Sequence, residues 1–246
     1  MTLPPASDLD QSFGREQVTA DERQKRIRHV FDAVAPRYDL MNDLMSFGIH
    51  RLWKRTLRRA CRDADGPVVD LAGGTGDVAR LLAGTGRHVV VCDPSLPMMA
   101  AGRGRGDAAI GWLAGEAERL PFADGSVGLL TVAFGLRNAT RLDAALSEIH
   151  RVLKPGGRFV CLEFSRPQWW LAPFYDLYSF LVIPRLGAAV AGEPAAYQYL
   201  VESIRRFPDQ HGFAGMIEAA GFTAVRWRNV SFGIACLHFG ERTDGR

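Results

Sequence analysis

The chain has 246 residues, of which 47% are hydrophobic and 23% are charged, and its formal net charge is +3. This composition fills the core of a normal domain and excludes global disorder, and the small net charge argues against nucleic-acid binding. We expect no signal peptide, because the N-terminus is polar, and no membrane span, because no uncharged apolar stretch reaches ~20 residues. A cytoplasmic protein is therefore predicted, and a place at the inner face of the membrane stays open.

The cysteines and histidines of the chain form no motif. The four cysteines are far apart and contain no C-x-x-C pair, so we expect them to be reduced, with Cys92 and Cys161 buried in apolar runs. None of the six histidines stands beside another histidine or a cysteine at the spacing of metal ligands. The sequence therefore predicts a reducing compartment and no metal site.

The N-terminal part predicts a tail followed by a helical cover. Residues 1–18 are polar and predict a flexible tail. Thr19 is followed three residues later by a glutamate, which is the pattern of a capping box, and apolar residues then recur at helical spacing over 20–34. A second helix is predicted over 49–62. We expect the segment 19–62 to cover a pocket of the core that follows.

The central part alternates between apolar runs and amphipathic segments, which is typical of βαβ units and a parallel sheet. A K-P-G-G turn should end the last helix of this part and begin the fifth strand. Strands are predicted at 67–72, 87–92, 109–114, 126–134 and 157–164, with helices between them at 76–84, 95–102 and 141–153.

The C-terminal part departs from this alternation. Residues 167–206 are rich in aromatic residues and predict an aromatic helical insertion, a helix follows over 209–220, and 222–230 and 234–240 predict an antiparallel hairpin. Five alternating strands followed by such a hairpin are the layout of class I methyltransferases. We predict a single domain over 19–246 with an α/β fold, namely a doubly wound, mostly parallel seven-stranded sheet with helical lid elements and a C-terminal antiparallel hairpin.

The stretch V-V-D-L-A-G-G-T-G-D at 68–77 joins an apolar run to a glycine turn, and a second apolar run ends 23 residues after Asp70, at Asp93. Gly74 and Gly76 let the backbone approach a ligand, and Asp93 can bind the two hydroxyls of a ribose. The glycines also fit the dinucleotide pattern G-x-G-x-x-G/A, so a dinucleotide oxidoreductase stays an alternative. Asp70 argues against it, because this carboxylate would repel a pyrophosphate and suits the sulfonium and ammonium groups of S-adenosylmethionine.

Longer stretches are more specific than the glycine turn. They read F-D-A-V-A-P-R-Y-D-L-M-N-D-L-M-S-F-G-I-H-R-L-W-K-R at 31–55, D-L-A-G-G-T-G-D at 70–77, A-F-G-L-R-N at 133–138, R-V-L-K-P-G-G-R at 151–158 and E-F-S-R-P at 163–167. From about Val30 to His238 the chain resembles the ubiquinone/menaquinone biosynthesis C-methyltransferase family. The resemblance implies an enzyme that transfers a methyl group from S-adenosylmethionine to a ring carbon of a polyprenylated quinol, either 2-methoxy-6-polyprenyl-1,4-benzoquinol or demethylmenaquinol.

The resemblance places cofactor contacts at Thr75, Asp93 and the pair Glu116 and Ala117. Two positions depart from the family, which usually has N-A in place of Glu116 and Ala117 and serine in place of Ala133. Glu116 keeps an oxygen that can accept a hydrogen bond from the adenine amino group. Ala133 has no hydroxyl, so a contact there would have to come from the backbone.

Carbon methylation needs a phenol that has lost its proton, because phenolate electron density makes the ortho ring carbon nucleophilic. Arg137 can stabilise the phenolate, His50 can accept the proton, and Asp39 can act as a base or orient one; these are the predicted catalytic residues. The alternatives are an arginine that only pairs with a carboxylate, as Glu163 would offer, and an ordinary histidine at a helix N-terminus. Tyr38 is predicted to cover the methionine end of the cofactor.

The predicted substrate contacts are Asn138, which can hold a quinol oxygen, and the aromatic side chains of Phe134 and Tyr175. The aromatic stretch 169–199 is either ordinary core packing or a channel for a polyprenyl tail, with peripheral contact to the membrane. We also expect association with other quinone-synthesis enzymes and a homodimer. A methyltransferase for another small or lipid acceptor, and a scaffold that binds the cofactor without catalysis, stay open as alternatives.

Overall fold

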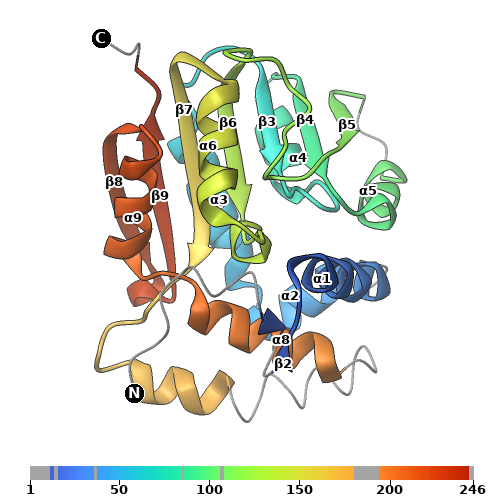
Figure 1. Cartoon of the computed structure of the whole chain (residues 1–246), viewed down its shortest axis with the longest axis vertical. Helices are drawn as coiled ribbons and strands as arrows, with labels where there is room; N and C mark the ends of the chain where they lie inside the picture. The colour runs from blue at the N-terminus through green and yellow to red at the C-terminus, as the bar shows by residue number, and fades with distance from the viewer. Residues whose placement is uncertain are drawn as a thin grey trace.

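The structure is a computed structural model and describes residues 12–13, 16–35, 38–84, 86–105, 108–179 and 194–243. At its centre lies a seven-stranded sheet with the strand order β5-β4-β3-β6-β7-β9-β8 (Figure 1). Its strands are β3 (Val68–Leu71), β4 (Val89–Asp93), β5 (Ile110–Ala114), β6 (Val127–Ala133), β7 (Leu153–Phe164), β8 (Thr223–Val230) and β9 (Ala235–Glu241). Strands β5, β4, β3, β6 and β7 are parallel to one another, and β9 runs antiparallel to both β7 and β8. This arrangement confirms the predicted fold class and the terminal hairpin.

Helices cover both faces of this sheet. Leu146 of α6 and Phe213 of α9 share one core with Phe159 of β7, whereas Leu57 of α3 lies in a second core with Val160. Phe159 and Val160 are neighbours in β7, so consecutive side chains enter opposite cores, as the two-residue period of a strand requires. The helices with described bounds are α1 (Ala20–Val34), α2 (Tyr38–Ser46), α3 (Ile49–Ala60), α4 (Asp77–Ala83), α5 (Leu96–Arg103), α6 (Leu142–Val152), α8 (Pro194–Arg206) and α9 (Gln210–Ala219).

Helix α1 has the predicted bounds because its N-terminus is capped by its own side chains. The backbone N–H of Glu22 donates to Oγ1 of Thr19 at 3.3 Å, and the N–H of Thr19 donates to Oε2 of Glu22 at 3.0 Å. Farther along α1, the buried Arg23 donates to the backbone carbonyls of Asn138 at 3.3 Å and Ala139 at 3.2 Å. Helix α1 is thereby tied to the loop that follows β6.

Three predicted boundaries were wrong. The segment at Tyr38 and Asp39, for which no helix was predicted, begins helix α2, whose Met41 and Met45 face an interior cavity one helical turn apart. The predicted tail contains two short paired strands, β1 (Ser12–Phe13) and β2 (Glu16–Gln17). Strand β7 begins four residues earlier than predicted, because the K-P-G-G stretch extends the strand itself.

All four cysteines are buried thiols without a disulfide, as expected for a reduced protein, and burial raises the pKa of Cys92 to about 12. The predicted aromatic insertion is helical over 172–179 and in α8, while 180–193 lies outside the described residues. Among the helices that the structure describes, none is both long and apolar enough to cross a membrane. The carboxyl ends of the parallel strands point toward α1, α2 and α8, which gather at that end of the sheet (Figure 1).

Candidate active site

The glycine turn after β3 is shaped by backbone that glycine adopts without strain. Gly74 has a φ of +53°, and a Cβ atom added to it would lie 2.9 Å from Cε of Met98. Its N–H donates to Oδ2 of Asp93 at 2.8 Å, and the N–H of Ser95 donates to Oδ1 of the same carboxylate at 2.8 Å. Asp93 therefore joins the turns after β3 and β4 at the carboxyl edge of the sheet, where open α/β sheets bind ligands.

Asp70 supports the same turn from within the sheet and is 1% exposed. Its Oδ1 accepts from Oγ1 of Thr131 at 2.9 Å, and its Oδ2 accepts from the N–H of Ala79 at 3.1 Å. Burial raises the pKa of this carboxyl to about 7 against the opposing effect of both hydrogen bonds. A cation beside Asp70 would favour its ionised form, so the residue suits the sulfonium and ammonium groups of S-adenosylmethionine.

A cavity of about 130 Å³, the cofactor cavity, contacts both carboxylates. Gly76 does not line it, because a Cβ atom added there would lie 2.8 Å from the ring of Trp112, and this glycine instead allows the close packing of α4. Tyr38 begins α2, but its side chain lies outside the described residues. The predicted cofactor residues that do line the cavity are Asp70, Gly74, Thr75, Asp93, Glu116 and Ala117.

Helix α1 covers the cofactor cavity through two polar contacts. Arg28 donates from Nη2 to Oε1 of Glu116 at 2.7 Å, so the glutamate that departs from the family pattern is paired with the cover. Asp32 accepts from Oγ of Ser95 at 2.6 Å. The glycine cradle, the buried carboxylates and this cover together fit S-adenosylmethionine.

A second cavity of about 330 Å³, the acceptor cavity, adjoins the first, and Phe31, Lys54, Ala133 and Phe134 line both. Its wall is mostly apolar, as is typical of a site for a small organic molecule. Residues of α1, α2, α3, α8 and the helical segment 172–179 form this wall. The predicted residues that line it are His50, Phe134, Arg137 and Tyr175.

Arg137 is buried in the wall of the acceptor cavity, on the short 3-10 helix η3 (Leu136–Asn138). Its Nη1 donates to Oε1 of Glu163 at 3.1 Å and to the backbone carbonyl of Phe134. Burial raises the pKa of the Glu163 carboxyl, and the Arg137 guanidinium opposes that rise. Arg137 therefore pairs with Glu163 and also lines the acceptor cavity.

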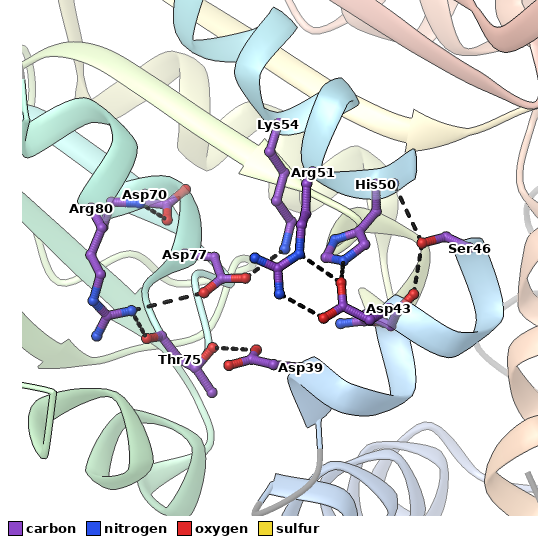
Figure 2. A network of polar contacts seen from close by, with 12 residues as sticks. Asp39, Asp43, Ser46, His50, Arg51, Lys54, Asp70, Thr75, Asp77 and Arg80 are labelled. Atoms are coloured by element: carbon purple, nitrogen blue, oxygen red, sulfur yellow. Dashed lines mark hydrogen bonds and ion pairs between the residues drawn. The ribbon is translucent and has the colours of Figure 1, made fainter. Parts of the chain in front are cut away.

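His50 lies in the first turn of α3 and is 5% exposed. Its Nε2 is 2.8 Å from Oδ1 of Asp43, and Arg51 donates to both oxygens of Asp43, at 2.7 Å from Nε and 2.6 Å from Nη2 (Figure 2). The tight link between α2 and α3 depends on Gly48, whose φ is +73°. Burial lowers the pKa of His50 despite its bond to Asp43, so the imidazole is neutral near pH 7.

Asp39 lies on the cofactor side and not in the wall of the acceptor cavity. Its Oδ1 accepts from Oγ1 of Thr75 at 3.1 Å (Figure 2). Its Oδ2 pairs with Arg105. Nearby, Nζ of Lys54 donates to Oδ2 of Asp77 at 3.0 Å. The Thr75 and Arg105 partners of Asp39 tie α2 to the glycine turn, and the role of Asp39 as a base or as a residue that orients one stays a prediction.

Asn138 was predicted to hold a quinol oxygen. It lines the cofactor cavity, and its Oδ1 accepts from the hydroxyl of Tyr199 on α8 at 3.0 Å. Tyr199 itself lines the acceptor cavity, so Asn138 supports that wall from behind. Burial raises the pKa of Tyr175, the other predicted polar contact, to about 12, which keeps its hydroxyl protonated.

Sequence reasoning missed three polar residues of this site: Asp43, Lys54 and Tyr199. Asp43 and Lys54 lie within the stretch 31–55 that carried the resemblance, but a helical assignment for 38–46 was needed to bring Asp43 toward His50. Tyr199 was noted only as one of many aromatic residues. Its hydrogen bond joins residues 61 positions apart, and no local pattern signals such a pair.

Comparison with known sequences agrees with this geometry. The model of the ubiE/COQ5 methyltransferase family matches residues 18–242. A ubiquinone/menaquinone biosynthesis C-methyltransferase UbiE of Rubrivivax gelatinosus is 66% identical over 235 residues, which are 95% of this chain and 94% of that protein. A protein of the same name from Caulobacter vibrioides is 50% identical over 248 residues, covering 95% of this chain and 98% of the relative.

Solved structures agree on the fold. A SAM-dependent methyltransferase from Thermotoga maritima superposes with a TM-score of 0.64 at 19% identity, covering 88% of this chain and 100% of that one. The [4+2]-cyclase SpnF superposes with a TM-score of 0.65 at 15% identity, covering 90% and 97%. Since a cyclase shares the fold, the fold alone does not specify the reaction. The family match and the two adjoining cavities specify the reaction. We identify the chain as a member of the ubiE/COQ5 methyltransferase family and an S-adenosylmethionine-dependent C-methyltransferase.

Proposed function

We propose that the enzyme methylates a ring carbon of a polyprenylated quinol, either 2-methoxy-6-polyprenyl-1,4-benzoquinol or demethylmenaquinol. The observation that carries this proposal is the shared wall of the two cavities, at Lys54, Ala133 and Phe134. An in-line displacement requires donor and acceptor to meet in a pocket that excludes water, and an apolar acceptor cavity that adjoins the cofactor cavity meets this requirement. The names of the relatives support the quinol as acceptor.

The chemistry asks little of the protein beyond charge and proton control. When bound, S-adenosylmethionine supplies a methyl group whose bond to sulfur breaks as the bond to the ring carbon forms. Before this, the phenol O–H must lose its proton. Attack through the ring carbon gives a dienone, the hydrogen on the methylated carbon then moves to the carbonyl oxygen, and one proton is released overall. The site therefore needs a proton acceptor and a group that stabilises negative charge on oxygen.

Arg137 supplies the positive charge in this proposal. Its guanidinium lines the acceptor cavity, and Glu163 and the carbonyl of Phe134 fix its orientation. A guanidinium that is held in place in an apolar wall stabilises a phenolate more strongly than it would in water. His50 is the proton acceptor, because it lines the same cavity and burial favours its neutral form.

The remaining predicted residues position the reactants. Asp70 and Asp93 hold the cationic and ribose parts of the cofactor, while Thr75 and Asp39 close the glycine turn against α2. Tyr38 is proposed to cover the methionine end of the cofactor from the start of α2. Phe134 and Tyr175 contact the quinol ring, and Asn138 acts through Tyr199.

A polyprenyl tail has to leave the acceptor cavity toward a bilayer. The helical segment 172–179 forms part of the cavity wall and also exposes large apolar side chains, with Phe174 70% exposed and Leu177 60% exposed. Trp169 is 86% exposed, and Trp170 packs on Phe232, which is 60% exposed. Such amphipathic rings favour the membrane interface, and we propose peripheral contact with the inner face of the membrane through this rim.

The direct test is methyl transfer from labelled S-adenosylmethionine to short-tailed benzoquinol and to demethylated naphthoquinol, each compared with its oxidised quinone. Label in the quinol products alone is the expected result, because only the reduced ring has a phenol to deprotonate. Equal labelling of quinone and quinol, or binding of the cofactor with no labelled product from either ring, would overturn the proposal. The ratio of the two quinol rates identifies the preferred ring.

A further inference from the structure

We propose that Asp43 is a positioning residue that holds His50 with Nδ1 free to accept the phenol proton. The inference rests on the proposed function and adds to it a residue and an atom. Its basis is the chain of contacts from Arg51 through Asp43 to His50, together with the place of His50 in the wall of the acceptor cavity.

The first step concerns the charge of Asp43. Arg51 donates to both of its oxygens, at 2.7 Å and 2.6 Å, which is the two-point geometry that holds a carboxylate most firmly (Figure 2). The guanidinium keeps the pKa of the Asp43 carboxyl well below its usual range. Asp43 is therefore ionised at any pH at which the enzyme works, and an ionised carboxylate can only accept hydrogen bonds.

The second step concerns the tautomer of His50. Because Asp43 only accepts, the ring nitrogen 2.8 Å away, Nε2, must carry a hydrogen and donate it. A neutral imidazole has one N–H, so Nδ1 then has a free lone pair. Among the residues that the structure describes, Nδ1 has no hydrogen-bond partner although it is buried. A buried acceptor without a partner is unfavourable, and a donor that enters the adjoining cavity removes that cost.

The third step concerns the donor. The acceptor cavity is mostly apolar, and a quinol brings an O–H group into it. The phenol proton moves to Nδ1, the electron pair of the O–H bond stays on the phenolate, and Asp43 stabilises the imidazolium that results. His50 returns the proton to solvent once the methylated ring carbon of the dienone has passed its own hydrogen to the carbonyl oxygen. Asp43 acts at both stages without itself gaining a proton.

The charged surroundings keep the neutral ring favoured until substrate arrives. Burial is the main cause that lowers the pKa of His50, and the positive charge of Lys54 lowers it further, whereas Asp43 and Asp77 raise it. Activity should therefore fall as pH decreases through a pKa below 6.5. The charged and titratable groups on the elements around His50 are Asp43 on α2, Arg51 and Lys54 on α3, Asp77 on α4, Arg137 on η3, Tyr175 and Tyr178 on the segment 172–179, and Tyr199 on α8.

The test separates this role from a structural link between α2 and α3. In protein labelled with 15N-histidine, the ligand-free enzyme at pH 7.5 should show His50 as the Nε2–H tautomer, and Asp43→Asn should abolish that preference. With a quinol acceptor, Asp43→Asn should lower kcat on the order of 10²–10⁴-fold and leave the Kd for S-adenosylmethionine within threefold. Asp143→Asn, at an exposed position on α6, is the matched control and should change neither value.

A second variant, His50→Gln, keeps a side-chain donor for Asp43 but has no basic nitrogen. It should retain the melting temperature of the wild type while losing as much kcat as Asp43→Asn. Turnover within threefold of wild type in either variant, or an Nδ1–H tautomer in the wild type, would overturn the inference. A failure of the proposed function is distinguishable, because the wild type would then methylate no quinol while the NMR measurement still reports the tautomer.

Discussion

The two cavities of this enzyme are built in different ways. The cofactor cavity rests on the carboxyl ends of β3 and β4, where backbone N–H groups and the carboxylates of Asp70 and Asp93 fix the glycine turn. The acceptor cavity has a wall of helices instead, and its polar groups are held by side-chain pairs such as Arg137 with Glu163 and His50 with Asp43. A sheet edge is rigid and general, whereas a helical wall can be changed to suit another substrate.

This difference predicts separable effects. Changes among the side-chain pairs of the acceptor cavity should alter turnover and leave the affinity for S-adenosylmethionine intact. Changes at the sheet edge should do the reverse. Residues that join the sheet edge to the helical wall, such as Asp39 with Thr75, should have small effects on both turnover and the affinity for S-adenosylmethionine.

The largest effect is expected from Arg137→Ala. The change leaves the Glu163 carboxylate buried without its partner, which should lower the free energy of unfolding by about 3–5 kcal/mol and kcat on the order of 10³-fold. Adding Glu163→Gln should restore most of the stability and none of the turnover. Urea unfolding measures the stability, single-turnover kinetics measure the rate of methyl transfer, and calorimetry measures the Kd for S-adenosylmethionine. A Kd weakened more than tenfold in the double variant would break the separation of the two cavities.

Asp70→Asn should weaken S-adenosylmethionine on the order of 100-fold, because the cation loses its carboxylate. Its effect on stability depends on pH. The folded pKa of Asp70 is raised to about 7 from 3.8, so its stabilising contribution is complete below pH 3.8 and is lost as pH rises through 7. Between pH 5.5 and 8 the wild type should lose about 2 kcal/mol of unfolding free energy relative to the variant. Parallel unfolding curves at the two pH values would contradict this interpretation of Asp70.

A moderate effect is expected from replacing two exposed side chains of the rim that do not line the acceptor cavity, Trp169→Ser and Leu177→Ser together. Turnover of a long-tailed quinol in anionic vesicles should fall about tenfold, because less apolar surface enters the interface. Turnover of a short-tailed quinol in solution is the internal control and should stay unchanged. An equal loss with both substrates would mean that the rim shapes the acceptor cavity and has no role in reaching the bilayer.

The smallest effect is expected from Asp39→Asn. The variant keeps the shape of the side chain and weakens its contacts to Thr75 and Arg105, so both the Kd for S-adenosylmethionine and kcat should change by about threefold to tenfold. Equilibrium binding and steady-state rates with saturating quinol measure the two. A loss on the order of 10³-fold in kcat alone would return Asp39 to the role of a base.

The sequence predicts the cofactor side well because its signals are local. The apolar run, the glycine turn and Asp93 lie within 26 residues, and strand order in a parallel sheet brings them together. The bounds of α1 follow from a capping box that spans four residues. Gly76 is the exception on this side, because only the packing of Trp112 shows that it faces away from the cavity.

The acceptor side is less predictable because its contacts span long stretches of chain. Asp43 reaches His50 only when 38–46 is a helix, and no helix was predicted for that segment. Asn138 was expected at the quinol, but it lines the cofactor cavity and accepts a hydrogen bond from Tyr199 of α8. The positions of Asp43 and Asn138 both depend on packing against elements that are distant in the sequence. No pattern in the neighbouring sequence indicates that packing.

We expect Arg23 to impose an order on the binding of the methyl donor and the acceptor. This buried side chain holds α1, the cover of the cofactor cavity, against the carbonyl groups of the η3 loop that carries Arg137. If α1 lifts to admit the donor, these hydrogen bonds to the loop break as well. We therefore predict a compulsory sequence in steady-state kinetics, in which the methyl donor enters first and its demethylated product leaves last.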